Sequence, residues 1–212
     1  MLNNPRVLAL ISKVCFFIYR HAAALVVLSP GFKRLLLERG VPEKKIHLIY
    51  NWCDEAALTI SSYSDNDIVT KMQGYFNIVF AGTMGKAQAL EVVLQAAVIV
   101  AEQNKKIRFV FVGGGIEVER LKDLANQLCL QNVLFLPRMP MSKIGQVLDL
   151  ADVLLVHLRK DPLFAITIPS KTQAYMAVGK PLLMAVEGDA ANLVVNSGAG
   201  LIAEPENAES IA

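Results

Sequence analysis

A lysine at a predicted helix start is the first residue whose surroundings suggest chemistry. Pro169 interrupts any preceding structure, Ser170 is a favourable N-cap, and Gly179 can end the helix in the left-handed conformation. Lys171 then lies in the first turn, where the positive end of the helix dipole repels its charge unless both share an anion. This arrangement predicts a phosphate site. A capped surface helix with a solvated lysine is the alternative.

A second lysine follows a predicted buried strand. The segment Gly82-Thr83-Met84-Gly85-Lys86 carries two glycines, which allow a phosphate to approach the backbone closely. We expect Lys86 and Lys171 to neutralise a diphosphate from opposite sides. The substrate-binding residues predicted from the whole sequence are Gly82, Thr83, Gly85, Lys86, Arg138, Pro169, Ser170 and Lys171.

Short apolar strands alternate with helices over the second half of the chain. Strands are expected at residues 75–81, 107–112, 133–136, 153–157, 182–186 and 201–203, with helices at 90–101, 118–129, 143–150, 170–178 and 190–195. Such alternation predicts an α/β fold with a doubly wound parallel sheet. In the order 3-2-1-4-5-6, ligands bind outside the carboxyl ends of the first and fourth strands, whose loops carry Lys86 and Lys171.

The first part of the chain resembles the end of another domain. A strand, a helix and a strand are expected at residues 24–28, 32–39 and 46–50, and a less hydrophobic stretch follows. We therefore predict the last elements of a truncated domain at 1–54, a linker at 55–74, and the main domain at 75–212. The final helix, opening near Pro205, is expected to be cut off by the end of the chain. Asp65-Asn66-Asp67 in the linker is interpreted as a solvated turn rather than a metal motif.

The apolar stretch at residues 8–28 is interrupted by Lys13, Arg20 and His21. Each central charge would cost about 2.5–3.5 kcal/mol in a membrane-spanning helix, so a span is disfavoured. Arg6, Lys13 and Arg20 recur every seven residues and share one face of an amphipathic helix. Such a helix either covers a sheet, the interpretation we favour, or lies on a membrane surface.

Composition excludes some classes of function. The net charge of +2 and the lack of dense basic runs disfavour a nucleic-acid partner. Cys15, Cys53 and Cys129 have no metal-type spacing, and their odd number indicates reduced thiols in the cytosol.

Several other residues invite a functional interpretation. Gly113-Gly114-Gly115 follows the second strand but lacks the further features of a dinucleotide motif, so we interpret it as a tight turn. Arg138 follows the third strand and either reaches a base or phosphate or is an exposed loop residue. His21, His47 and His157 are expected to be structural.

Five segments, in this order, resemble the retaining glycosyltransferases of family 4, which have the two-domain GT-B architecture. The segments are Val26-Val27-Leu28-Ser29-Pro30-Gly31-Phe32-Lys33, Ile49-Tyr50-Asn51-Trp52-Cys53-Asp54, Phe80-Ala81-Gly82-Thr83-Met84-Gly85-Lys86-Ala87-Gln88, Phe111-Val112-Gly113-Gly114-Gly115, and residues 168–181. The resemblance implies two Rossmann-like domains, with residues 1–54 the end of the acceptor domain and residues 75–212 the donor domain. Within the family, the chain is similar to bacterial N-acetyl-fucosamine transferases of O-antigen and capsule assembly.

The resemblance also implies a reaction. A sugar would pass with retention from a nucleoside diphosphate sugar, expected to be a UDP-sugar, to a lipid-linked saccharide, in the cytoplasm or peripherally at the inner membrane. No metal or cofactor is expected, because lysines and helix dipoles stabilise the departing diphosphate. A chain of this extent is expected to bind donor without transferring sugar by itself. The alternatives are a nucleotide-sugar epimerase of similar architecture and a non-catalytic nucleotide-sugar binding module.

The family also implies site residues. Gly82, Lys86 and the 169–171 segment would contact the diphosphate, the Arg138 loop would hold the base, and Asn51 and Asp54 would lie in the hinge. Three positions depart from the family pattern. Two family glutamates are replaced by Ile166 and Ala174, and a frequent arginine is replaced by Thr83. No catalytic residue is therefore assigned.

Overall fold

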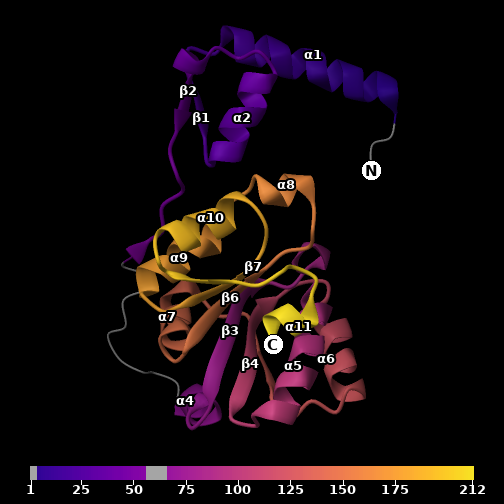
Figure 1. Ribbon diagram of the computed structural model, residues 1–212, viewed down its shortest axis with the longest axis vertical. Coiled ribbons are helices and arrows are strands. Elements are labelled where there is room, and N and C mark those ends of the chain that lie inside the picture. Colours follow the sequence, from indigo (N-terminus) through magenta and orange to yellow (C-terminus); the bar gives the residue numbers. More distant parts are fainter. Residues whose placement is uncertain (1–3, 56–65) are drawn as a thin grey trace. The chain divides into compact units, whose positions relative to one another are not determined.

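The computed structural model describes residues 4–55 and 66–212, and the chain forms two compact units, Met1–Tyr50 and Asn51–Ala212 (Figure 1). The domain boundaries expected from the sequence, at 54/55 and 74/75, stay a prediction.

The first unit is small. Its elements are α1 (Pro5–His21), β1 (Leu25–Val27), α2 (Pro30–Glu38), the 3-10 helix η1 (Glu43–Lys45) and β2 (Ile46–Leu48). β1 and β2 are parallel, and α2 begins at Ser29, whose hydroxyl accepts the Phe32 N–H at 3.2 Å. A compact cluster joins these elements, formed by Val27, Leu36, Val41 and Ile46. Short apolar strands and a capped amphipathic helix thus suffice for a small core.

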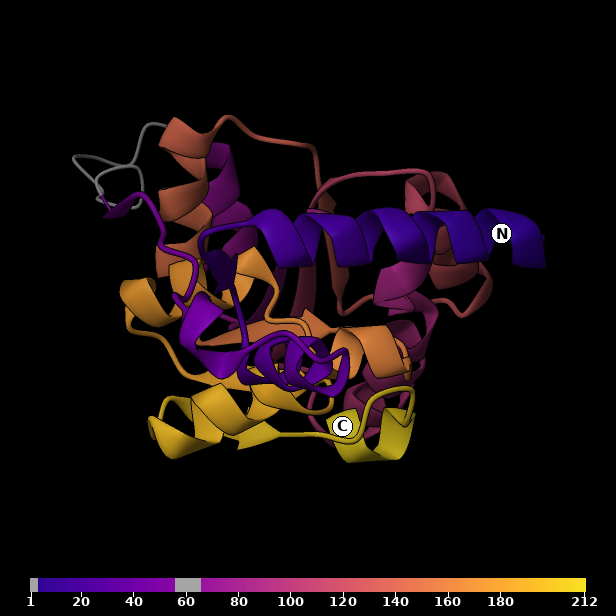
Figure 2. The ribbon, with the colours of Figure 1, turned by 90° about the horizontal axis from the view of Figure 1, so that it is seen from above.

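Helix α1 is one continuous helix in both views (Figures 1 and 2). Tyr19 packs against the small core, but no residue of α1 is buried. Arg6, Lys13 and Arg20 are exposed. The expectation that this helix covers a sheet is therefore not confirmed in the described structure. Among the described residues, no helix combines the length and hydrophobicity needed to cross a membrane.

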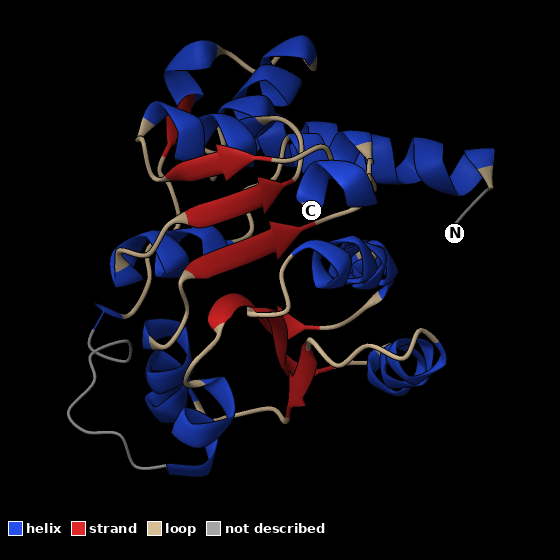
Figure 3. Cartoon of the chain, turned by 60° about the horizontal axis from the view of Figure 1, so that its bottom comes forward, coloured by secondary structure: helices blue, strands red, loops and turns tan. Residues whose placement is uncertain are grey.

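The second unit contains a six-stranded parallel sheet in the order β5-β4-β3-β6-β7-β8 (Figure 3). The strands are β3 (Phe76–Thr83), β4 (Ile107–Gly114), β5 (Val133–Leu136), β6 (Val153–His157), β7 (Leu182–Ala185) and β8 (Gly200–Ile202). This order is the predicted 3-2-1-4-5-6, so the doubly wound α/β fold is confirmed. The strands form because their residues are apolar on both sides, as burial between two helical layers requires.

Helices cover both faces of this sheet. They are α4 (Asn66–Met72), η2 (Lys86–Gln88), α5 (Leu90–Gln103), α6 (Val118–Gln127), α7 (Met141–Asp149), α8 (Pro162–Ala165), α9 (Ser170–Val178), α10 (Asp189–Asn196) and α11 (Ala208–Ile211). One face carries α5, α6 and α11 against a cluster that includes Phe80 and Phe111. The other carries α4, α7, α9 and α10 against Val79, Val110 and their neighbours. Successive residues of β3 thus enter opposite cores.

Among the described residues, two α-helices were not predicted from the sequence. Part of the expected linker forms α4, whose Ile68 and Met72 are 8% and 1% exposed in the core. Its Asp67 pairs with Lys71 at 2.5 Å, one helical turn away, while Asp65 lies outside the described residues. Helix α8 lies in the long segment after β6, where Asp161 caps it by accepting the Leu163 N–H at 2.8 Å. Helix α4 thus packs on the second unit, because two buried apolar residues at i and i+4 anchor it.

Candidate functional site

The central strands β3 and β6 separate toward their carboxyl ends. They pair only at Ile78–Val153 and Val79–Leu154, whereas β3 stays paired with β4 as far as Thr83–Gly114. The backbone of β3 beyond Val79 therefore has no strand partner on the β6 side. This is the position where the winding of the sheet reverses and where ligands of such folds bind.

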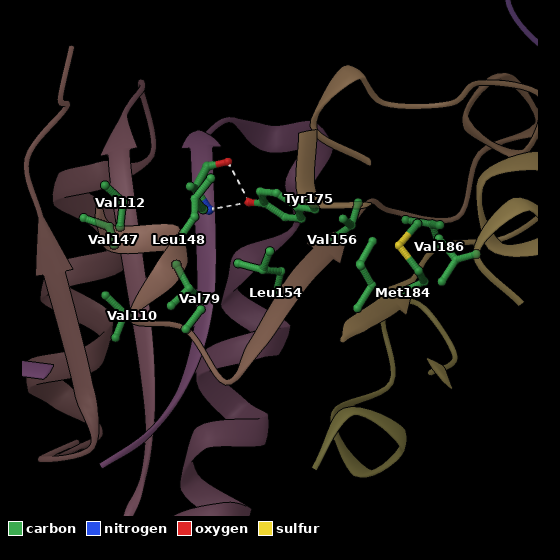
Figure 4. Close-up of a cluster of buried hydrophobic side chains, with 14 of the residues drawn as sticks. Val79, Val110, Val112, Val147, Leu148, Leu154, Val156, Tyr175, Met184 and Val186 are labelled. Carbon is green, nitrogen blue, oxygen red and sulfur yellow. Dashed lines mark hydrogen bonds between the residues drawn. The ribbon is translucent and has the colours of Figure 1, made fainter. Parts of the chain in front are cut away.

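Tyr175 of α9 fills this separation. Its hydroxyl accepts the Ala81 N–H at 2.7 Å and donates to the Ala81 carbonyl at 3.0 Å (Figure 4). The side chain is 2% exposed, and burial raises its pKa, so it stays protonated and able to donate. One hydroxyl thus satisfies both backbone groups that β6 leaves unpaired. Sequence reasoning missed this role, although Tyr175 stands one helical turn after Lys171 and shares its face.

Lys171 lies directly against β3. Its Nζ is 3.6 Å from the centre of the Phe80 ring, and it is 2.9 Å from where a Cβ on Gly82 would stand. Within residues 4–55 and 66–212, no hydrogen bond or ion pair to this ammonium is found. Burial lowers the pKa of Lys171 from its ordinary 10.5 to about 7. A buried cation that has no anionic partner favours the binding of an anion.

Close backbone approach requires a glycine at position 113, near the end of β4. Gly113 and Gly114 are the last residues of β4, in register with Gly82 and Thr83. Gly113 has φ of +140°, and a Cβ there would lie 2.0 Å from the Gly82 carbonyl oxygen. The interpretation of the segment as a tight turn was therefore wrong for Gly113 and Gly114, which belong to the strand, whereas Gly115 opens a turn by accepting the Val118 N–H at 3.3 Å.

The loop after β3 contains a short 3-10 helix of its own. The Gly85 N–H donates to the Gln88 side chain at 3.0 Å, so it is already engaged within the loop. Lys86 begins the short helix η2, and the long helix α5 starts only at Leu90. Lys86 is thus exposed in the 3-10 helix, four residues before the long helix begins. We therefore expect Lys86 to contribute to diphosphate binding through its own charge.

The start of α9 also differs from the predicted one. Pro169 occupies the N-cap position without a side-chain cap, and Ser170 is the first helical residue, so the N-cap prediction for Ser170 was wrong. Proline can take this place because its backbone geometry suits a helix start. The predicted end is confirmed, since Gly179 is left-handed with φ of +75°.

Arg138 lies at the same edge of the sheet. It is exposed, and its Cβ is 3.8 Å from where a Cβ on Gly114 would stand. The structure therefore brings Lys171 onto Gly82, and Arg138 beside the residue paired with Thr83. Lys86 lies in the exposed 3-10 helix that follows β3. The roles of these residues in substrate binding stay a prediction.

His157, at the end of β6, is a structural residue as expected. Its Nδ1 lies 2.6 Å from the Gln88 carbonyl oxygen, and its Nε2 accepts the Glu206 N–H at 3.2 Å. Burial lowers its pKa, which favours the neutral ring that this pattern needs. The ring ties the loops after β3 and β8 together. Lys160, in the segment after β6, also contacts the loop after β8 through an ion pair with Glu204 at 2.6 Å.

The two positions where the family has glutamates lie on either side of the α9 start. Ile166 follows α8 and Ala174 lies within α9, and both are half-buried. Neither position supplies a carboxylate, so the structure assigns no catalytic residue.

The sequence is similar to known glycosyltransferases. Probable glycosyltransferase WbjE of Pseudomonas aeruginosa is 27% identical over 207 residues, covering 96% of this chain and 51% of the relative. WcaI of Escherichia coli K12, named among colanic acid biosynthesis glycosyl transferases, is 26% identical over 191 residues, covering 87% and 46%. The chain thus spans about half the length of the curated relatives it matches.

Solved structures share the fold. Alr3699/HepE of Anabaena, in complex with UDP and glucose, matches with a TM-score of 0.75 at 18% identity, covering 95% of this chain and 55% of that one. WaaG, a glycosyltransferase involved in lipopolysaccharide biosynthesis, matches with a TM-score of 0.68 at 16% identity, covering 88% and 51%.

The family comparison covers most of the second unit. The model of the family described as glycosyl transferases group 1 matches residues 65–212, which include the whole six-stranded sheet and both lysine-bearing loops. The chain therefore belongs to the glycosyl transferases group 1 family.

Proposed function

We propose that the second unit binds the diphosphate of a nucleoside diphosphate sugar, with UDP-sugars as the donor class, for glycosyl transfer by the whole protein. One observation carries the proposal: the Lys171 ammonium is held against Phe80 and Gly82 with no anionic partner among the described residues. It lies where β3 and β6 separate, at the edge where this kind of sheet binds ligands. The UDP bound to HepE supports the choice of nucleotide.

In this proposal the protein acts through charge and position. Lys171 and Lys86 neutralise the diphosphate as it departs, and the backbone N–H groups at the start of α9 add the positive end of a helix dipole. Gly82 leaves the space beside β3 that a Cβ would take from Lys171. Arg138 lies farther along the edge, beside Gly114, and is proposed to face the base.

The finer assignments also belong to the proposal. We assign retention of configuration, a lipid-linked saccharide acceptor and a role in O-antigen or related polysaccharide synthesis, for which the names of WbjE and WcaI give general support. N-acetyl-fucosamine transfer is the proposed subtype. The reaction is placed in the cytoplasm, with peripheral membrane contact through the exposed cationic stripe of α1. Transfer itself is expected of the whole protein rather than of these 212 residues.

Removal of either lysine should weaken UDP binding. Each charge-assisted contact to phosphate contributes roughly 1.5–3 kcal/mol, so Lys86→Ala and Lys171→Ala should each weaken UDP by about tenfold or more. Calorimetric titration of UDP, with uridine beside it, measures the effect. Uridine lacks the phosphates and should be affected much less.

Lys180→Ala is the matched control. Lys180 follows the C-terminal end of α9, and its Nζ is 4.0 Å from Asp149. Its removal should leave the UDP affinity unchanged. If the folded Lys86 and Lys171 variants bound UDP as tightly as the Lys180 variant, the diphosphate site would have to lie elsewhere.

A further inference from the structure

Three consecutive residues of β3 are contacted by one face of α9. Phe80 and Gly82 adjoin the Lys171 ammonium, and Ala81 between them is bonded to the Tyr175 hydroxyl. Lys171 and Tyr175 stand four residues apart, so they are stacked on the same side of the helix. The ammonium and the hydroxyl are thus presented to β3 as one unit.

The Tyr175 contact is the specific polar attachment of this helix to the strand. The hydroxyl bonds both the N–H and the carbonyl of Ala81, which is 94 residues away in the chain. A helix packed only by apolar side chains could slide, whereas two short hydrogen bonds to one peptide allow little displacement. A shift of α9 by a fraction of a turn would carry Lys171 off Gly82.

We propose that Tyr175 is a positioning residue, which holds the Lys171 ammonium over Gly82 at the diphosphate site by anchoring α9 to Ala81. The expected effect of Tyr175 on UDP binding rests on the proposed function. Its structural content, the placement of Lys171, can be measured without any ligand.

The test in the ligand-free chain reads the environment of Lys171. Lysine amines are converted to ¹³C-dimethylamines, and the Lys171 signal, assigned with Lys171→Arg, is followed against pH by NMR. Tyr175→Phe should raise the apparent pKa of this amine from about 7 toward the ordinary 10.5, because the released helix lets it reach water. An unchanged titration in the folded variant would overturn the proposal.

The test with ligand is a double-mutant cycle on UDP affinity. Tyr175→Phe should weaken UDP about fivefold and uridine by less than about twofold, and it should add almost nothing in a Lys171→Met background. Equal effects in both backgrounds would mean that Tyr175 only stabilises the fold, which would overturn the proposal. If wild-type chain bound no UDP, the proposed function would fail, while the titration would still decide the positioning role.

Two further variants control for stability. Asn132→Ala removes a buried bond of similar kind, from Nδ2 to the Ala97 carbonyl at 2.9 Å, in the other core. It should lower stability without changing UDP affinity or the Lys171 titration. If Tyr175→Phe fails to fold, p-aminophenylalanine at position 175 replaces it. Its amine donates to the Ala81 carbonyl but accepts poorly, so the Lys171 titration should move part of the way, and no movement would count against the proposal.

Discussion

Gly113→Ala is expected to destabilise the second unit by about 3 kcal/mol or more, a large effect for the addition of one methyl group. The new Cβ would lie 2.0 Å from the Gly82 carbonyl oxygen. The φ of +140° at Gly113 is also one that residues with a side chain rarely adopt. Backbone strain and overpacking each contribute roughly 1–3 kcal/mol. Relief requires β3 and β4 to separate at the residue that faces Lys171, so UDP binding should be lost as well. Urea unfolding and calorimetry measure the two effects.

Gly114→Ala is the matched control in the next residue. Gly114 has no positive φ, and the nearest atom to its added Cβ is the Arg138 Cβ at 3.8 Å, an ordinary contact. Its urea midpoint should stay close to that of the wild type. Equal shifts for the two alanines would show that the strands tolerate a Cβ at Gly113, contrary to the register described above.

The affinity for UDP-glucose is expected to fall by about tenfold or more between pH 7 and pH 8.5. In the ligand-free chain, burial lowers the pKa of Lys171 to about 7, so the amine loses its proton over this range. The bound diphosphate raises that pKa again, so binding must take up a proton that becomes scarcer as pH rises. The diphosphate of UDP-glucose carries no proton that titrates in this window. Calorimetry at several pH values gives the slope.

Two variants separate Lys171 from other titrating groups. Lys171→Arg keeps the charge at every pH and should remove most of the slope, whereas Lys86→Ala should weaken binding but keep it. A slope that persisted in Lys171→Arg would place the titrating group elsewhere.

The same pKa has a consequence for stability. Between about pH 7 and 10.5 the unfolded chain holds a proton on Lys171 that the folded chain does not, so this residue makes the free energy of unfolding rise with pH. Below pH 7 both states are protonated, and the cost of burying the charge is fully present. Lys171→Met should therefore stabilise the ligand-free chain most below pH 7, as read from urea midpoints.

The sequence by itself determined the topology of the second unit. Its strands are apolar runs separated by helical patterns, and parallel strands with right-handed crossovers leave few ways to order them. The order then places the loops with Lys86 and Lys171 at the reversal of the winding, before any side-chain contact is known. Local residue chemistry also predicted the end of α9 at Gly179, because glycine adopts the left-handed conformation that commonly ends a helix.

The tertiary structure decided how the candidate site is built. That Tyr175 bonds Ala81, that Gly113 faces the Gly82 carbonyl, and that the Gly85 N–H is engaged by Gln88 cannot be read from periodicity. Hydrophobic patterns repeat every two or 3.6 residues and specify which face is buried, but not which atoms meet across it. Hydrogen-bond partners and backbone clearances depend on where strands separated by dozens of residues stop pairing. For that reason the phosphate site could be predicted at Lys171 from the sequence, but only the packed structure places its ammonium against Phe80 and Gly82.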